Sequence, residues 1–78
     1  MLVSLQQALA HIETLPDSAL LTEDEAAAWL RLSSQTLAND RAKRRLGIPF
    51  CRLGRAIRYP KGEVSTWLSA HTVRPSAV

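Results

Sequence analysis

The chain has 78 residues, of which 46% are apolar, and carries a formal net charge of +3. This length predicts one compact domain with a small core, and the apolar content argues against general disorder. No apolar run is long enough to cross a bilayer, and the first residues lack the basic start and long apolar stretch of a signal peptide. We therefore expect a cytoplasmic protein with no membrane partner.

Residues 1–19 are expected to form an amphipathic helix followed by a linker. Ser4 and Gln7 are spaced as in a capping box, and apolar residues then recur at helical spacing. The pattern predicts a helix at about residues 5–14, ended by Pro16. Its apolar stripe either completes a small core or meets a second protomer or a partner protein.

Residues 20–69 carry the pattern of a helix-turn-helix followed by a hairpin. Thr22 and Glu25 are spaced as in a second capping box, which predicts a helix that runs to about Arg31. Ser33 is a good N-cap for the next helix, so only a short turn separates the two helices. Two short helices joined in this way are typical of a helix-turn-helix.

A hairpin and a last helix are expected to complete this domain. Residues 51–59 predict two strands joined by a tight turn at Gly54-Arg55, and residues 60–68 predict a helix that starts at a proline. Residues 70–78 show no period and are expected to form a flexible tail. The apolar side chains expected to be buried in the hairpin are Leu53, Ile57 and Tyr59.

The helix after Ser33 is the candidate recognition helix. With Leu37 at its buried pole, the opposite face carries small and amide side chains, and Asn and Gln can pair bidentately with adenine. The alternative is a short solvated helix with a charged tail. The expected contacts to DNA bases are Ser34, Gln35, Ala38 and Asn39.

The charges are separated along the chain. Residues 1–25 contain five carboxylates and no lysine or arginine, whereas residues 41–61 contain eight cations and no carboxylate. Such segregation is typical of a surface that binds a polyanion, although a solvated charged face is the alternative. Gly54 and Arg55, at the hairpin tip, are placed to enter a minor groove or hold phosphates. The expected phosphate contacts are Arg41, Lys43, Arg44, Arg45, Arg52 and Arg58.

Other chemistries find little support in the sequence. Cys51 is the only cysteine, so no disulfide framework can form, and His11 and His71 do not have metal-ligand spacing. No arrangement of nucleophile, base and orienting group can be read from the spacing of the polar residues. We therefore expect no metal, no cofactor, no small-molecule ligand and no enzymatic activity.

Residues 20–68 resemble the small winged helix-turn-helix domains of the excisionase and AlpA-type phage regulators, distant relatives of the MerR DNA-binding domain. The resemblance implies a mainly α fold with a small β-hairpin, preceded here by an extra N-terminal helix. It also implies that the helix after Ser33 lies in the major groove and that the hairpin contacts the minor groove. The matching segments are residues 21–27, 32–37, 49–55, 57–59 and 63–68.

Two positions depart from the pattern of this family. Asp40 stands where many relatives carry an aromatic residue, often Trp, which packs between the recognition helix and the wing. An acid there either pairs with Arg44 one turn later or changes how the wing sits. Arg31 replaces the glycine that is often found in the turn.

The resulting hypothesis is a sequence-specific binder of double-stranded DNA. By analogy with the family, it is an excisionase, or recombination directionality factor, that assists an integrase in excising a mobile element. Such a small domain is expected to bind as several copies on adjacent sites. One alternative is an AlpA-type transcriptional regulator, and another is a protein-binding adaptor that does not read DNA.

Overall fold

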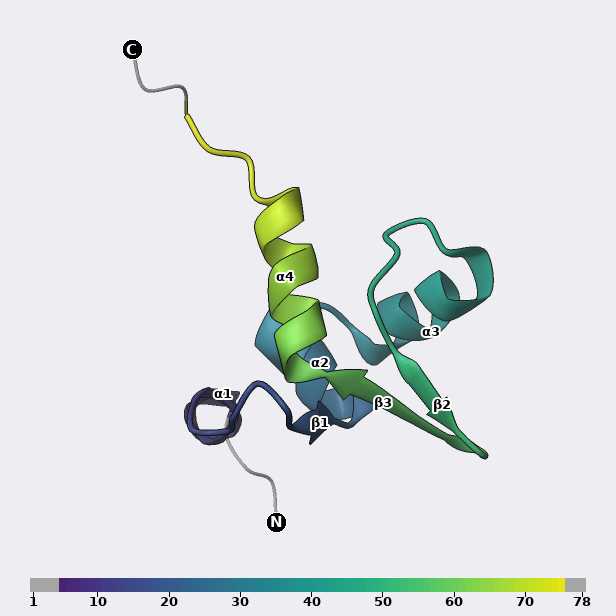
Figure 1. The fold of residues 1–78 in the computed structure, drawn as a ribbon, viewed down its shortest axis with the longest axis horizontal. Helices are drawn as coiled ribbons and strands as arrows, with labels where there is room; N and C mark the ends of the chain where they lie inside the picture. The colour runs from purple at the N-terminus through teal and green to yellow at the C-terminus, as the bar shows by residue number, and fades with distance from the viewer. Residues whose placement is uncertain (1–4, 76–78) are drawn as a thin grey trace.

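The computed structural model describes residues 5–75, and the predicted N-cap Ser4 lies outside them. Figure 1 shows α1 at the left edge of the protein, α3 and a hairpin at the right edge, and α4 extending away from the centre. The elements in chain order are α1 (Leu5–Glu13), β1 (Leu20–Leu21), α2 (Glu23–Leu30), α3 (Ser34–Lys43), β2 (Cys51–Leu53), β3 (Ala56–Pro60) and α4 (Lys61–His71).

Helices α2 and α3 form the predicted helix-turn-helix. Both bonds of the capping box are present: the Thr22 amide donates to Glu25 Oε1 at 2.8 Å, and the Glu25 amide donates to Thr22 Oγ1 at 3.2 Å. Ser33 caps α3, since its Oγ accepts from the Thr36 amide at 3.1 Å. Between the helices, Arg31 has φ 60° and ψ 35°, the left-handed conformation that favours the glycine expected there.

The sheet has three antiparallel strands in the order β1-β3-β2. In the hairpin, Leu53 lies opposite Ala56, so Gly54 and Arg55 form a two-residue loop. Gly54 has φ 63°, the positive value that a type II′ turn needs at its first loop position. Strand β1, which pairs with β3, was not predicted, because two residues are too few to show the alternation of a strand.

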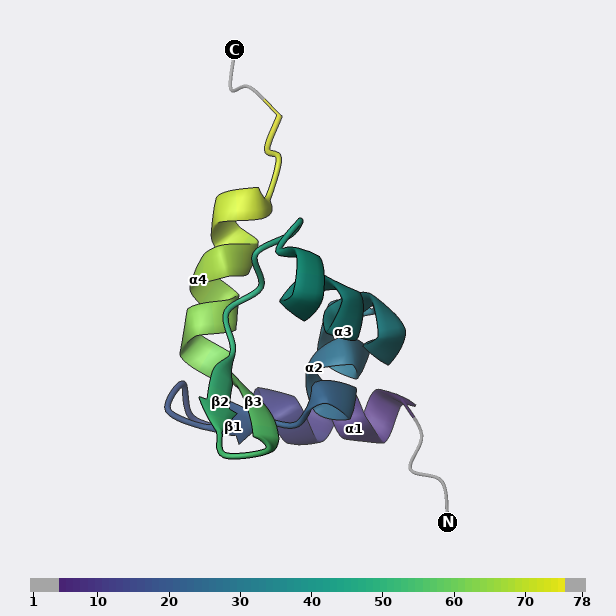
Figure 2. The same ribbon diagram turned by 90° about the vertical axis from the view of Figure 1, so that its right-hand side faces the viewer.

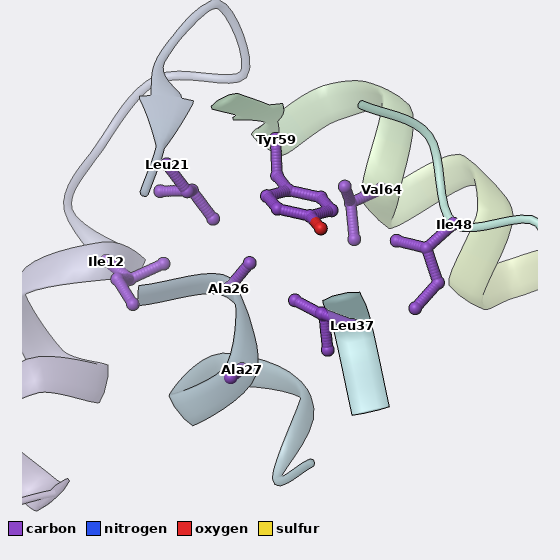
Figure 3. Packing of buried hydrophobic residues seen from close by; sticks show 8 residues of the cluster. All are labelled: Ile12, Leu21, Ala26, Ala27, Leu37, Ile48, Tyr59 and Val64. Atoms are coloured by element: carbon purple, nitrogen blue, oxygen red, sulfur yellow. The ribbon is translucent and has the colours of Figure 1, made fainter. Parts of the chain in front are cut away.

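The hydrophobic core lies where α1, α2, α3, α4 and the sheet meet (Figure 3). Tyr59 lies between Leu21 and Val64, and the alanines of α2 allow the helices to approach closely. Ile12 of α1 is fully buried in this core, a contribution of about 1.5–3 kcal/mol to folding. This favours completion of the core as the role of the α1 stripe. The buried residues are Ile12, Leu21, Ala26, Ala27, Leu37, Ile48, Tyr59 and Val64.

Two details of the sequence-based prediction are wrong. Leu53 is 53% exposed, because the hairpin extends past the core and leaves the residue next to the turn nothing to pack against. Helix α4 begins after Pro60, which is the last residue of β3, and continues to His71, beyond the predicted end at residue 68. Ile57 is half-buried and Tyr59 is buried, as expected.

The linker after α1 is fastened to the start of α4. Lys61, one of the eight cations of residues 41–61, is buried, and its Nζ donates to the Leu15 carbonyl at 2.6 Å. The Gly62 amide donates to the Asp17 carbonyl at 2.9 Å, and a Cβ at position 62 would lie 3.1 Å from that oxygen. The close approach therefore favours glycine at position 62. The division of the chain at residue 19 stays a prediction.

Candidate nucleic-acid interface

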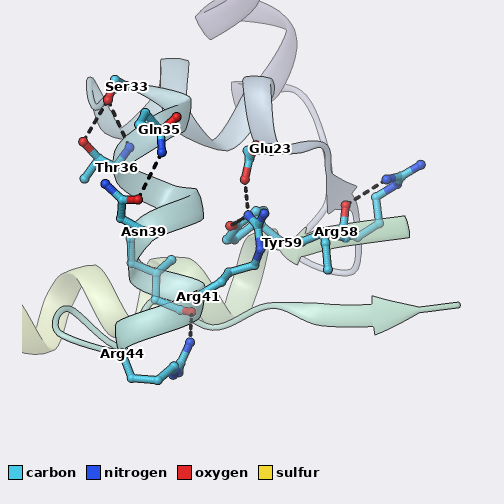
Figure 4. A network of polar contacts seen from close by, with 11 residues as sticks. Glu23, Ser33, Gln35, Thr36, Asn39, Arg41, Arg44, Arg58 and Tyr59 are labelled. Atoms are coloured by element: carbon cyan, nitrogen blue, oxygen red, sulfur yellow. Dashed lines mark hydrogen bonds and ion pairs between the residues drawn. The ribbon is translucent and has the colours of Figure 1, made fainter. Parts of the chain in front are cut away.

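The outer face of α3 presents an amide pair. Leu37 is fully buried, which turns the opposite side of the helix outward. Gln35 and Asn39 are exposed, and Gln35 Nε2 donates to Asn39 Oδ1 at 3.0 Å (Figure 4). Ser34 and Ala38, the other expected base contacts, are half-buried.

The hydrogen bond between Gln35 and Asn39 determines which donors and acceptors of the Asn39 amide remain available to a ligand. Asn39 Oδ1 has two lone pairs, of which Gln35 uses one, and both Nδ2 hydrogens remain available. A free acceptor and a free donor on the same amide are the groups needed to bind adenine bidentately. Gln35 therefore orients the side chain that is best suited to read a base.

Asp40 lies on the inner side of α3 and is 4% exposed. Its Oδ1 accepts from the amides of Leu46 and Gly47 at 2.5 and 3.1 Å, and its Oδ2 accepts from the Ile48 amide at 2.9 Å. Within residues 5–75 it forms no ion pair, so the first of the two alternatives for this acid, pairing with Arg44, is not observed. Asp40 instead fixes the loop that leads from α3 to the hairpin.

These contacts also determine the protonation of Asp40. Burial alone would raise the pKa of its carboxyl, because it disfavours the charged form. The three backbone hydrogen bonds and the positive charge of Arg44 act in the opposite direction and prevail, so the pKa of Asp40 lies below its ordinary value. Asp40 is therefore charged at neutral pH.

Arg41 links three elements of the fold. Its Nη1 donates to Glu23 at the start of α2 and to the Tyr59 hydroxyl of β3, the latter at 2.8 Å (Figure 4). Burial raises the pKa of Tyr59, so its hydroxyl stays protonated at neutral pH. The structure thus gives Arg41 a role in packing α3 against α2 and β3, and its expected phosphate contact stays a prediction.

The other expected phosphate contacts differ in how they are held. Arg44 Nη1 donates to the Ile48 carbonyl at 3.3 Å, and Arg58 Nη1 donates to the Ile57 carbonyl at 2.8 Å. The guanidinium groups of Arg44 and Arg52 lie 5.2 and 5.8 Å from the centroid of the Phe50 ring. In the described part of the chain, six exposed cations make no side-chain hydrogen bond or ion pair, namely Arg31, Lys43, Arg45, Arg52, Arg55 and Arg74.

The fold brings α3 and the hairpin to the same side of the protein. Figure 2 looks at the right-hand side of Figure 1 and shows α3 and the hairpin both facing the viewer, with α2 behind α3. A depression of about 220 Å³ also opens on α3 and the loop that follows it. It is lined by Thr36, Asn39, Asp40, Lys43, Arg45 and Leu46.

Sequence reasoning overlooked two residues of this surface. The sequence pattern assigns no role to Phe50, which contacts both Arg44 and Arg52. The available signal was its spacing from Arg52, because residues two apart share a face in extended chain. Glu23 lies in the first turn of α2, and its bond to Arg41 cannot be read from the sequence because it depends on the packing of α2 against α3.

A helix-turn-helix whose second helix exposes amides beside an arginine-tipped hairpin defines a winged helix-turn-helix, a class of DNA-binding proteins. A family model described as a helix-turn-helix domain matches residues 20–72, more than half of the chain. The chain therefore belongs to this family, that of the small excisionase and AlpA-type helix-turn-helix proteins, and is a DNA-binding protein. Searches of curated proteins and of solved structures found no match.

The described residues were also searched for two other kinds of feature. Between residues 5 and 75, no helix has the length and apolar character needed to span a membrane. In the same part of the chain, no three His, Cys, Asp or Glu residues are grouped so that they could hold a metal ion.

Proposed function

We propose that this DNA-binding protein is an excisionase, which binds attachment-site DNA and assists an integrase in excising a mobile element. Its membership of the excisionase and AlpA-type family supports this role. The observation that supports sequence-specific reading is the exposed, hydrogen-bonded pair Gln35 and Asn39 on α3, beside the arginine-tipped hairpin. In a bacterium, the DNA target would be reached in the cytoplasm.

In the proposed complex, α3 lies in the major groove. Asn39 pairs with an adenine, Gln35 holds the Asn39 amide in the orientation for that pairing, and Ser34 and Ala38 contact neighbouring bases. A methyl group such as that of Ala38 suits the C5-methyl group of thymine. Each good bidentate pair contributes roughly 1–3 kcal/mol of discrimination against the wrong base.

The hairpin and the cations around α3 would contact the DNA backbone. Arg55 enters the adjacent minor groove at the turn that Gly54 makes possible. Phosphate contacts supply affinity that depends steeply on salt, with a slope of roughly −0.9 in log K against log salt for each phosphate. The proposed phosphate contacts are Arg41, Lys43, Arg44, Arg45, Arg52 and Arg58.

Self-association and the integrase belong to the same proposal. One small domain covers little DNA, so useful affinity requires several copies on neighbouring sites. The alternative function is an AlpA-type transcriptional regulator, which would use the same interface at a promoter. The family match supports DNA binding rather than the protein-binding adaptor.

Selection from a random duplex library, followed by affinity measurements, tests the reading of DNA. Asn39→Ala and Gln35→Ala should reduce the ratio of affinities for selected and random duplex, because the first removes a base contact and the second removes the side chain that orients it. Arg55→Ala should weaken binding to both duplexes by a similar factor. Equal affinity of the unchanged protein for both duplexes at moderate salt would contradict sequence-specific reading.

An excision assay with the integrase, run beside a promoter reporter, tests the role. Excision should fall when the protein is omitted and should return when it is added. If excision is unchanged by its loss and transcription is altered, the protein is a regulator instead. The Asn39→Ala variant serves as the matched control, since it should fail in whichever assay depends on reading DNA.

A further inference from the structure

Two arginines from different elements share one aromatic ring. Arg44 ends α3 and Arg52 lies in β2, and their guanidinium carbons are 5.2 and 5.8 Å from the centroid of the Phe50 ring. These distances are typical of cation–π contacts. The two guanidinium carbons are therefore at most 11.0 Å apart.

The ring that holds them is itself fixed. Phe50 is half-buried, packs against the core, and lies with its centroid 6.3 Å from that of Tyr59 at a tilt of 49°. Arg44 has a second restraint, because its Nη1 donates to the Ile48 carbonyl at 3.3 Å. Phe50 thus orders two long side chains before a ligand binds, which reduces the conformational entropy that they lose on binding.

The charge of this cluster is only partly balanced within the described chain, because the Asp40 carboxylate interacts with the charge of Arg44 without forming an ion pair. The ion pair in residues 5–75 is that of Arg41 with Glu23, so neither Arg44 nor Arg52 is ion-paired there. Two guanidinium groups that contact the same ring repel one another, and anions bound to them reduce that repulsion. Because a guanidinium binds phosphate oxygens in a planar, bidentate way, a phosphate fits such a cluster best.

We propose that Phe50 is a positioning residue that holds Arg44 and Arg52 as a preformed clamp for the DNA backbone phosphates between the recognition helix and the wing. This proposal rests on the proposed function and separates the basic residues into those that Phe50 positions and those that it does not. Arg44 and Arg52 act through the ring, whereas Arg45, which makes no ring contact, hydrogen bond or ion pair within residues 5–75, acts independently.

The first test compares Phe50 variants of the full chain by fluorescence anisotropy on selected and random duplex. Phe50→Leu should weaken binding to both duplexes by about fivefold to tenfold, since it removes two cation–π contacts. The slope of log K against log salt should become shallower by about 1 to 2, the contribution of one or two phosphates. Phe50→Trp, which keeps an aromatic face, should bind within about twofold of the unchanged protein.

A variant with pentafluorophenylalanine at position 50 separates ring electrostatics from packing. It keeps the ring shape and apolar surface but removes the negative face that attracts a cation. It should weaken DNA binding as Phe50→Leu does, while circular dichroism and the thermal midpoint stay close to those of the unchanged protein. Binding equal to that of the unchanged protein would overturn the clamp, even if Phe50→Leu fails to fold.

A double-mutant cycle tests whether the ring and the arginines act together. Arg52→Ala should weaken DNA binding several-fold in the unchanged protein and by a clearly smaller factor when position 50 carries pentafluorophenylalanine. Arg45→Ala is the matched control and should weaken binding by the same factor in both backgrounds. If Arg52→Ala weakens binding by the same factor in both backgrounds, the clamp is overturned. If instead the unchanged protein binds selected and random duplex equally well, the proposed function is overturned.

Discussion

Helices α2 and α3 both end in a left-handed arginine, but the two ends are held in different ways. Arg31 has φ 60° and Arg44 has φ 53°. After Arg31 the next helix starts at residue 34, and the turn is closed by bonds such as that from the Leu32 amide to the Ala27 carbonyl at 2.9 Å. After Arg44 the chain must return to the hairpin, and Asp40 binds three amides of that loop.

The comparison explains why an acid lies beside a basic DNA-binding surface. A turn of two or three residues satisfies its amides with nearby carbonyls, whereas the amides of Leu46, Gly47 and Ile48 in the loop after α3 donate to the side chain of Asp40. A buried carboxylate offers several acceptor sites, so it can hold consecutive amides that would otherwise be unsatisfied. Asp40 therefore positions the loop, and with it Arg44 and Phe50.

Removing this carboxylate should have the largest effect. Asp40→Ala leaves the amides of Leu46, Gly47 and Ile48 without their acceptor, and we expect it to lower the free energy of unfolding by about 3 kcal/mol. Chemical denaturation followed by circular dichroism measures the change. Asp24→Ala, which removes an exposed carboxylate, should cost less than about 1 kcal/mol. Similar losses for the two variants would contradict a special role for Asp40.

The contacts of Asp40 also predict that the stability of the fold depends on pH. The pKa of Asp40 is lower in the folded state than its ordinary value of 3.8, so its ionised form contributes stability above that pH. This contribution should fall as the pH drops below 3.8 towards the lower folded value. Denaturation of the protein and of Asp40→Asn between pH 5 and 2.5 should show a steeper loss for the unchanged protein. Parallel pH profiles would rule out the depressed pKa.

Replacing the left-handed residue of the shorter turn should stabilise the protein. Arg31→Gly removes the steric cost of φ 60° in a side-chain-bearing residue, partly offset by the greater freedom of glycine when unfolded. We expect a gain of about 0.5–1 kcal/mol, measured as a rise in the thermal midpoint. A fall in the midpoint would mean that the Arg31 side chain contributes more than its backbone costs.

The smallest effect on stability is expected at the other helix end. Arg44→Gly relieves a similar backbone cost but removes the contacts of its side chain with the Ile48 carbonyl and the Phe50 ring. The two effects should cancel to within about 0.5 kcal/mol in thermal unfolding. DNA affinity should nevertheless fall, which Arg31→Gly should not cause. Equal gains in stability for both variants would show that the Arg44 contacts contribute little.

Local signals in the sequence predicted the helix-turn-helix and the hairpin well. The capping residues Thr22 and Ser33 act on amides three residues away, and Gly54 acts within its own turn, so each can be recognised without knowledge of the fold. The same holds for the outer face of α3, since the position of Leu37 determines which side chains lie opposite it. Gln35 and Asn39 are exposed as predicted.

The sequence by itself therefore determined the order of the helices and the hairpin, the family and the amide-bearing face of α3, because these depend on neighbouring residues and helical spacing. Only the tertiary structure decided the partners of the charged residues. Arg41 meets Glu23 eighteen positions earlier, and Lys61 meets the carbonyl of Leu15 forty-six positions earlier. The physical reason is that such bonds form only after the core has brought distant segments together, so no local pattern encodes which cations stay free to meet DNA.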